Sequence, residues 1–156
     1  MNMLKTKIIL FLWLLSFALL PNLSTTKASS SATLYIDPLN IIDPNVTPGT
    51  QLSFLIKVDN VTDLYAWQIK LYYDPEFLNW TGADYPPGHI FQGKSTAPVT
   101  PVNASDPEGV YVLYFLSLTG AQSGFTGSGI LCRVNFTVIA RGVSHLHFSR
   151  PLGEDT

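Results

Sequence analysis

Two pairs of residues have the side-chain types that metal binding or acid–base catalysis would need. His145 and His147 are two residues apart, which places both imidazoles on one strand face, where zinc or copper could bind. Asp74 and Glu76 could be the two carboxylates of a glycosidase, which must face each other across a cleft. No third metal ligand has a recognisable spacing, no EF-hand loop is present to bind calcium, and Asp74 precedes a proline, where turn chemistry explains it. We therefore predict no catalytic residue, no metal site, no cofactor and no enzyme activity.

Aromatic side chains within residues 65–91 are the second candidate site. Sugar rings stack on flat aromatic faces, so a row of exposed rings would form a carbohydrate platform. Strand alternation points Trp67, Tyr73 and Trp80 towards the core, Tyr72 points towards solvent, and two further aromatics lie in an expected loop. The candidate sugar-stacking residues are Tyr72, Tyr85 and Phe91.

The asparagines indicate export through a route that adds N-linked glycans. Six of the eight asparagines begin the acceptor motif Asn-x-Ser/Thr, and the first of the six, Asn22, lies in the expected leader. A threonine-rich β protein could also contain such triplets by accident. The candidate glycosylation sites of the mature chain are Asn45, Asn60, Asn79, Asn103 and Asn135.

The first thirty residues have the order of a secretory signal peptide. Lys5 and Lys7 precede residues 8–20, an apolar run with one serine, and a tract of small residues follows. A membrane anchor is the alternative, but a helix of this length spans only roughly 20 Å of a ~30 Å hydrocarbon core. We predict a signal peptide at residues 1–30, one secreted or surface domain at residues 31–156, and no membrane span after cleavage.

The charge balance excludes one class of partner. The chain has nine basic and eleven acidic residues, and three of its lysines lie in the leader. The mature domain therefore has six basic and eleven acidic residues, a formal charge of −5. A nucleic-acid-binding protein needs a basic stripe that displaces counterions from phosphates, so we expect no nucleic-acid partner.

The single cysteine, Cys132, cannot form an internal disulfide, so an exported domain of this kind must be stabilised by its core alone. Strand alternation points Cys132 inward. A thiol in that position acts as a small apolar side chain rather than as a nucleophile.

Alternating apolar and polar residues predict strands throughout the mature chain. The clearest run, residues 130–139, directs its even-numbered residues into the core and its odd-numbered residues into solvent. Residues 51–58 and 65–73 alternate in the same way, and residues 59–63 are expected to form the turn between them.

The remaining strands are shorter or less regular. Residues 110–118 are apolar on both faces, which is typical of a central strand covered on both sides. Short strands are expected at residues 33–36, 77–81, 90–93, 97–102 and 143–148. Seven to nine short strands with connections of this length predict an all-β, two-sheet sandwich.

Three segments resemble the cohesin family in their order and spacing. Residues 65–78 read YAWQIKLYYDPEFL, similar to the family's third strand, an alternating run that ends in Tyr-Asp-Pro, two further residues and a leucine. Residues 129–138 read GILCRVNFTV, similar to the family's late strand, and Pro48-Gly49-Thr50 resembles the entry to its second strand. The resemblance extends over residues 33–149.

The resemblance implies a nine-stranded jelly-roll sandwich and a non-catalytic module that docks the dockerin modules of glycoside hydrolases on polysaccharide. In that family, outward residues of the third and late strands contact the partner, so a glycan on Asn135 would obstruct docking. Ala66 and Gln68 stand where the family usually has Asn and Asp, so the partner could differ. The partner-face residues that the resemblance implies are Ala66, Gln68, Lys70, Tyr72, Leu131 and Arg133.

The end of the sequence departs from the family pattern. The family adds one more strand, which pairs near the first strand, well beyond the position that matches Phe148, whereas this sequence stops at Thr156. An unpaired sheet edge of that size is a site for aggregation. We therefore expect the sequence to be a fragment whose last strand is missing.

Three functions remain open at this point. The first is a cohesin-like module that binds a dockerin-type or other surface protein. The second is a carbohydrate-binding module, which would be retained on polysaccharide. The third is a glycosylated building block of a surface layer or adhesive, which the number of acceptor motifs favours.

Overall fold

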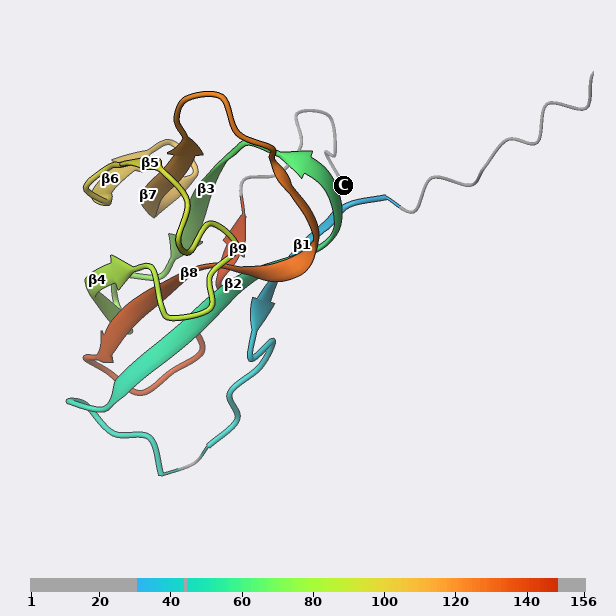
Figure 1. Ribbon diagram of the computed structural model, residues 1–156. Helices are drawn as coiled ribbons and strands as arrows, with labels where there is room; N and C mark the ends of the chain where they lie inside the picture. The colour runs from blue at the N-terminus through green and yellow to red at the C-terminus, as the bar shows by residue number, and fades with distance from the viewer. Residues whose placement is uncertain (1–30, 44, 149–156) are drawn as a thin grey trace, which may run out of the picture.

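The computed structural model describes residues 31–43 and 45–148, which form two antiparallel β-sheets packed face to face (Figure 1). Nine strands are described, within the predicted seven to nine. The part of the chain that the structure describes has no helix long and apolar enough to cross a membrane. The predicted signal peptide, residues 1–30, lies outside the described residues. The all-β, two-sheet sandwich is confirmed.

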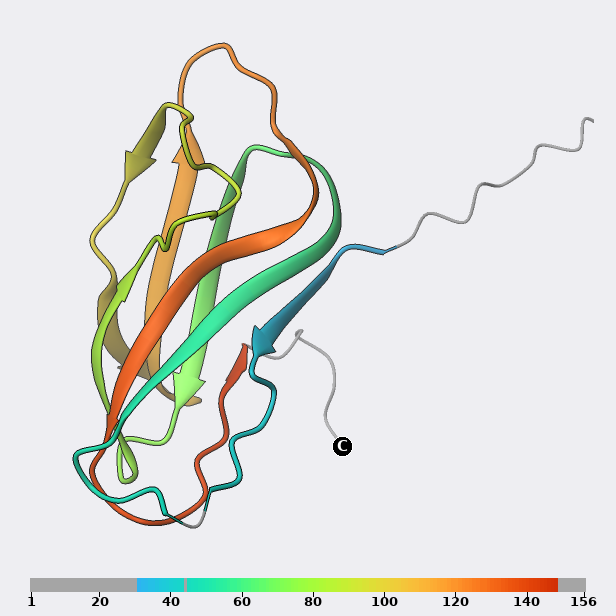
Figure 2. The same ribbon diagram turned by 60° about the horizontal axis from the view of Figure 1, so that its bottom comes forward.

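The first sheet has four strands. In spatial order they are β1 (Thr33–Asp37), β2 (Gln51–Leu64), β8 (Phe125–Val138) and β4 (Leu78–Asp84). The two long strands β2 and β8 run side by side in the middle of this sheet, as Figure 2 shows. β1 and β4 are its edges.

The second sheet has five strands. Four follow the order β5 (Thr96–Pro98), β7 (Gly109–Leu118), β3 (Ala66–Tyr73) and β9 (His147–Phe148), and β6 (Val102–Asp106) also pairs with β7. β7 is therefore the central strand, with β3 on one side and β5 and β6 on the other.

The core lies between the sheets and consists of alternate residues of the long strands. Phe136 of β8 is 0 % exposed, and its ring centroid lies 6.1 Å from that of Phe54 and 5.0 Å from that of Tyr73. No polar or charged side chain is buried among the described residues. The removal of apolar surface from water, worth roughly 25 cal/mol per Å², is thus the main stabilising contribution.

Cys132 lies in this core, as its alternation predicts, and burial raises the pKa of its thiol. The thiolate is the reactive form. We therefore expect iodoacetamide at mildly alkaline pH to leave Cys132 unmodified in the folded protein and to alkylate it fully in concentrated urea. Intact mass before and after treatment measures this, and rapid alkylation of the folded protein would contradict a buried thiol.

The predicted turn at residues 59–63 is wrong, because β2 continues through it. The register with β8 shifts twice between Val58 and Leu64, and Asn60 and Asp63 have positive φ values of 56° and 51°. Such bulges insert extra residues without ending the pairing. A Cβ on Gly124 would lie 2.5 Å from the carbonyl carbon of Asp63, so only glycine fits beside this bulge.

The strand predicted at residues 90–93 is also wrong. Ile90 and Phe91 enter the core from a turn, and the Ile90 amide donates to the Ile130 carbonyl at 2.9 Å. Ile90 and Phe91 are therefore apolar because they fill the core, and not because they belong to a paired strand. The prediction for residues 97–102 resolves into β5 and β6, and the strand predicted at residues 143–148 shortens to β9.

Candidate functional site

The residues predicted to form one partner face lie on two different sheets. Ala66, Gln68 and Lys70 are outer residues of β3 in the second sheet, whereas Arg133 is an outer residue of β8 in the first sheet. The outer faces of two packed sheets point in opposite directions. The prediction of a single face is therefore wrong. Asn135 also belongs to β8, so a glycan on it would lie on the outer face of the first sheet, away from the outer residues of β3.

The outer face of the second sheet combines polar residues of β3 with apolar residues of β6 and β7. Gln68 pairs with Phe115, and Leu113 lies between Lys70 on β3 and Val102 on β6. Val102 is 48 % exposed, and Leu113 and Phe115 are half-buried without belonging to the core. We call this surface the β3–β7 face, defined by Ala66, Gln68, Lys70, Val102, Leu113 and Phe115.

The sequence interpretation missed the apolar part of this face. Residues 110–118 were expected to be covered on both sides, but no described element covers the outer side of β7. The signal was present in the sequence, since Leu113 and Phe115 make this strand apolar on both faces. An apolar outer face without cover is typical of an interaction surface.

Tyr72 faces outward, as predicted, but it is only 1 % exposed. Its ring lies between that of Tyr111, 5.5 Å away, and that of His147, which stacks on it at 5.1 Å with an interplanar angle of 11°. The Tyr72 hydroxyl donates to Asp106 at 2.9 Å, and desolvation raises its pKa. The prediction that Tyr72 contacts a partner or a sugar is therefore wrong, because neighbouring side chains cover its ring.

Two opposite charges lie beside Tyr72 and neutralise each other. Lys70 forms an ion pair with Asp106, and its ammonium group lies 4.2 Å from the ring centroid of Tyr111. The hydrogen bond from Lys70 lowers the pKa of Asp106, and the same bond raises the pKa of Lys70. The β3–β7 face thus carries its lysine already paired, and its apolar residues dominate what a partner would meet.

The lowered pKa of Asp106 predicts an acid-dependent loss of stability. A carboxyl whose pKa falls on folding stabilises the folded state above its ordinary pKa, near 4, and this contribution disappears as the pH drops through the lowered value. We expect the wild type to be more stable than Asp106→Asn near neutral pH, with the difference narrowing below about pH 4. Urea titrations at several pH values measure the difference, and a gap that stays constant into strong acid would contradict the assignment.

The other two sugar-stacking candidates do not form a platform with Tyr72. Phe91 is 1 % exposed and belongs to the core. Tyr85 is half-buried, stacks on Tyr114 with centroids 4.7 Å apart, and donates its hydroxyl to the Phe115 carbonyl at 2.9 Å. The predicted row of exposed aromatics is wrong, because Phe91 lies in the core, Tyr85 packs against the core, and neighbouring side chains cover Tyr72.

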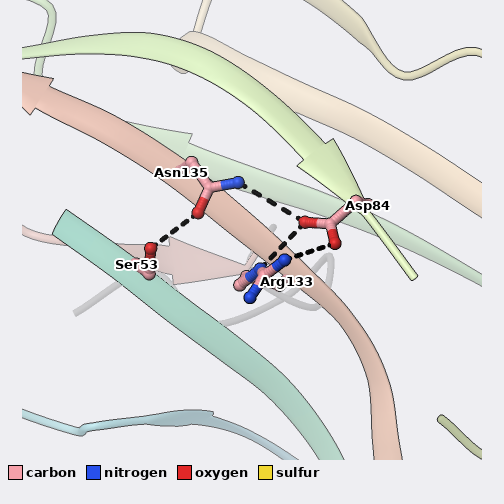
Figure 3. Close-up of polar contacts among 4 residues, drawn as sticks. All are labelled: Ser53, Asp84, Arg133 and Asn135. Atoms are coloured by element: carbon pink, nitrogen blue, oxygen red, sulfur yellow. Dashed lines mark hydrogen bonds and ion pairs between the residues drawn. The ribbon is translucent and has the colours of Figure 1, made fainter. Parts of the chain in front are cut away.

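The outer face of the first sheet carries a network of polar side chains joined by hydrogen bonds (Figure 3). Arg133 donates two hydrogen bonds to Asp84, at 2.9 and 2.6 Å. Asn135 donates to Asp84 at 3.4 Å and accepts from the Ser53 hydroxyl at 2.7 Å. This network connects β2, β8 and β4 across the sheet.

Leu131 does not belong to this polar network, although its odd-numbered place in the alternating strand predicted an outward position. Ile56 pairs with Cys132 while Lys57 pairs with Ile130, so Leu131 is an extra residue at a β-bulge. The bulge reverses the alternation, and Leu131 is 1 % exposed in the core. Its assignment to a partner face is therefore wrong.

His147 lies in β9 and His145 lies just before it, whereas Asp74 and Glu76 follow the end of β3. His145 and His147 are exposed, and no group of three His, Cys, Asp or Glu residues that could hold a metal is found among residues 31–43 and 45–148. Asp74 accepts a hydrogen bond from the Glu76 amide at 2.9 Å, which is the turn chemistry expected before Pro75.

Comparisons with known proteins agree with this architecture. The family model described as "Cohesin domain" matches residues 39–150. A type II cohesin domain from the cellulosome of Acetivibrio cellulolyticus is 18 % identical with a TM-score of 0.54, covering 78 % of this chain and 77 % of that chain. Type II cohesin A11 from Bacteroides cellulosolvens is 19 % identical with a TM-score of 0.51, covering 78 % of this chain and 79 % of that chain.

A third similar structure is a type II cohesin–X-dockerin complex from Acetivibrio cellulolyticus, 14 % identical with a TM-score of 0.55 and covering 78 % of this chain and 80 % of that chain. Identities this low show the shared fold alone. No curated protein matches the sequence. The family model, however, covers most of the chain, including the Tyr-Asp-Pro strand and the late strand, and the chain therefore belongs to the cohesin domain family.

Proposed function

We propose that the chain is an exported, non-catalytic module that binds a dockerin-type protein through its β3–β7 face. Such binding would assemble enzymes for polysaccharide degradation or attach proteins to a cell surface. Two similar structures are described as complexes with a dockerin, including the sixth cohesin of scaffoldin B from Acetivibrio cellulolyticus with a Cel5 dockerin. The order of residues 1–30 supports export, because it matches a signal peptide.

The apolar outer side of β7 is the observation that carries this proposal. Protein interfaces have an apolar centre depleted of unpaired charge and a polar rim. Phe115 and Leu113 supply such a centre, Val102 extends it, and Gln68 and the paired Lys70 border it. The polar network around Asp84 on the opposite sheet offers no comparable apolar centre.

Titration calorimetry with dockerin modules encoded in the same genome tests the proposal. We expect a one-to-one complex with at least one of them. The absence of binding to every such module, with retention on insoluble polysaccharide instead, would contradict it. Because Tyr72 and Phe91 are buried, we expect no retention on polysaccharide by the isolated domain.

A further inference from the structure

The five candidate glycosylation sites differ in how far their side chains are committed to other contacts. An N-linked glycan attaches to the side-chain amide nitrogen, Nδ2, of asparagine. Four asparagines are exposed, and no described residue accepts a hydrogen bond from their Nδ2 atoms. They are Asn45, Asn60, Asn79 and Asn103.

Each of these four is exposed in a loop, at a bulge or at a sheet edge. Asn45 is in the connection between β1 and β2, and Asn60 is in the bulge of β2. Asn79 belongs to the edge strand β4, and Asn103 belongs to β6. The Oδ1 atom of Asn103 accepts a hydrogen bond from the Tyr73 hydroxyl at 3.1 Å, which leaves its Nδ2 atom available.

Asn135 differs from the other four in position and in bonding. It is half-buried on β8, between β2 and β4, and both of its amide atoms are used (Figure 3). Oδ1 accepts from Ser53, and Nδ2 donates to Asp84, which Arg133 also holds. A glycan on this Nδ2 would have to displace the contact with Asp84 and cover the network, so molecules that carry it would fold less stably.

We propose that the folded, exported chain carries N-linked glycans at Asn45, Asn60, Asn79 and Asn103, that Asn135 remains unmodified, and that the β3–β7 face stays free of glycan for the protein partner. None of the five asparagines belongs to that face. Asn103 is nearest to it in the sequence, but it is adjacent to Val102 and therefore points to the other side of β6. The occupancy of the five asparagines rests on the proposed export, and only the glycan-free face rests on the proposed dockerin-type binding.

A map of occupied sites tests the first two parts without any partner. The chain is secreted from cells that perform N-glycosylation and then deglycosylated enzymatically in heavy-oxygen water, which converts each occupied asparagine to labelled aspartate. Peptide mass spectrometry should find the label at the four exposed sites and only a trace at Asn135. Equal labelling of Asn135 and Asn79, or no label at the exposed sites, would overturn the proposal.

Two substitutions provide a matched control for this map. Asn79→Gln should lower the intact mass by one glycan, because it removes an exposed acceptor. Asn135→Gln should leave the glycan mass unchanged, because it removes a site that is not used. A loss of one glycan in Asn135→Gln would contradict the assignment even if the peptide map were incomplete.

Binding experiments test the free face. Wild type with and without its glycans should bind the same dockerin module with dissociation constants within about twofold of each other. The double change Ala66→Asn and Gln68→Thr places an acceptor motif on the β3–β7 face, so its glycosylated form should lose binding while the form from non-glycosylating cells retains it.

The outcomes separate the two proposals. Loss of dockerin binding by the naturally glycosylated wild type, with binding restored after deglycosylation, would overturn the glycan-free face. If the unglycosylated wild type bound no dockerin module, the proposed function would fail, whereas the occupancy map would still decide which asparagines are modified.

Discussion

Phe115→Asp should weaken dockerin binding at least about thirtyfold, corresponding to the ~2 kcal/mol that defines an interface hot spot. Phe115 lies on the central strand of the β3–β7 face, opposite Gln68 and half-exposed. An aspartate there would replace an apolar contact with a charge that the partner must desolvate. Titration calorimetry measures the change in the dissociation constant.

Leu55→Asp is the matched control for this experiment. Leu55 is likewise a half-buried apolar residue on an outer strand face, but it belongs to β2 and pairs with Arg133 on the first sheet. We expect it to change binding less than about twofold. If Leu55→Asp abolished binding and Phe115→Asp did not, the partner would dock on the first sheet.

Phe136→Ala should destabilise the domain by about 3–5 kcal/mol, the usual cost of removing a fully buried phenylalanine. The Phe136 ring connects the two sheets, because it contacts Phe54 on β2 and Tyr73 on β3. Without a disulfide, this core is the main source of stability, and its loss leaves a cavity that rigid strands cannot close. Urea unfolding followed by tryptophan fluorescence measures the free energy of unfolding.

Thr137→Ala controls for the position on the strand. Thr137 is the next residue of β8, and its hydroxyl accepts a hydrogen bond from Gln51 at 2.7 Å on the outer face. Its replacement should cost only about 0.5–1.5 kcal/mol. Comparable losses of unfolding free energy from both substitutions would contradict a β8 strand whose inner face is buried and whose outer face is not.

Alternation along the strands was enough to predict the inner lining of the sandwich. Phe54, Val134 and Phe136 lie where their parity places them, because side chains repeat every two residues along a regular strand. Leu131 escaped this rule because a bulge adds one residue to β8. A bulge reflects pairing with β2, a strand distant in the sequence, so no local pattern shows it.

The candidate site could be predicted only in part, for a related reason. Alternation along a strand shows on which side of the strand a residue lies, but it does not show which sheet the strand joins. Gln68 and Arg133 were therefore predicted to share a face. Tyr72 was placed outward correctly, yet its ring is covered by His147, which reaches it through the pairing of β9 with β3. Both features depend on contacts between segments far apart in the chain.

Methyl NMR of the domain titrated with a dockerin module that binds it tests the central claim most directly. The methyl signals of Val102 and Leu113 report the β3–β7 face, and those of Leu55 report the opposite sheet. We expect the signals of Val102 and Leu113 to shift or broaden on binding while those of Leu55 stay in place. Shifts at Leu55 with unchanged Val102 and Leu113 signals would contradict the account.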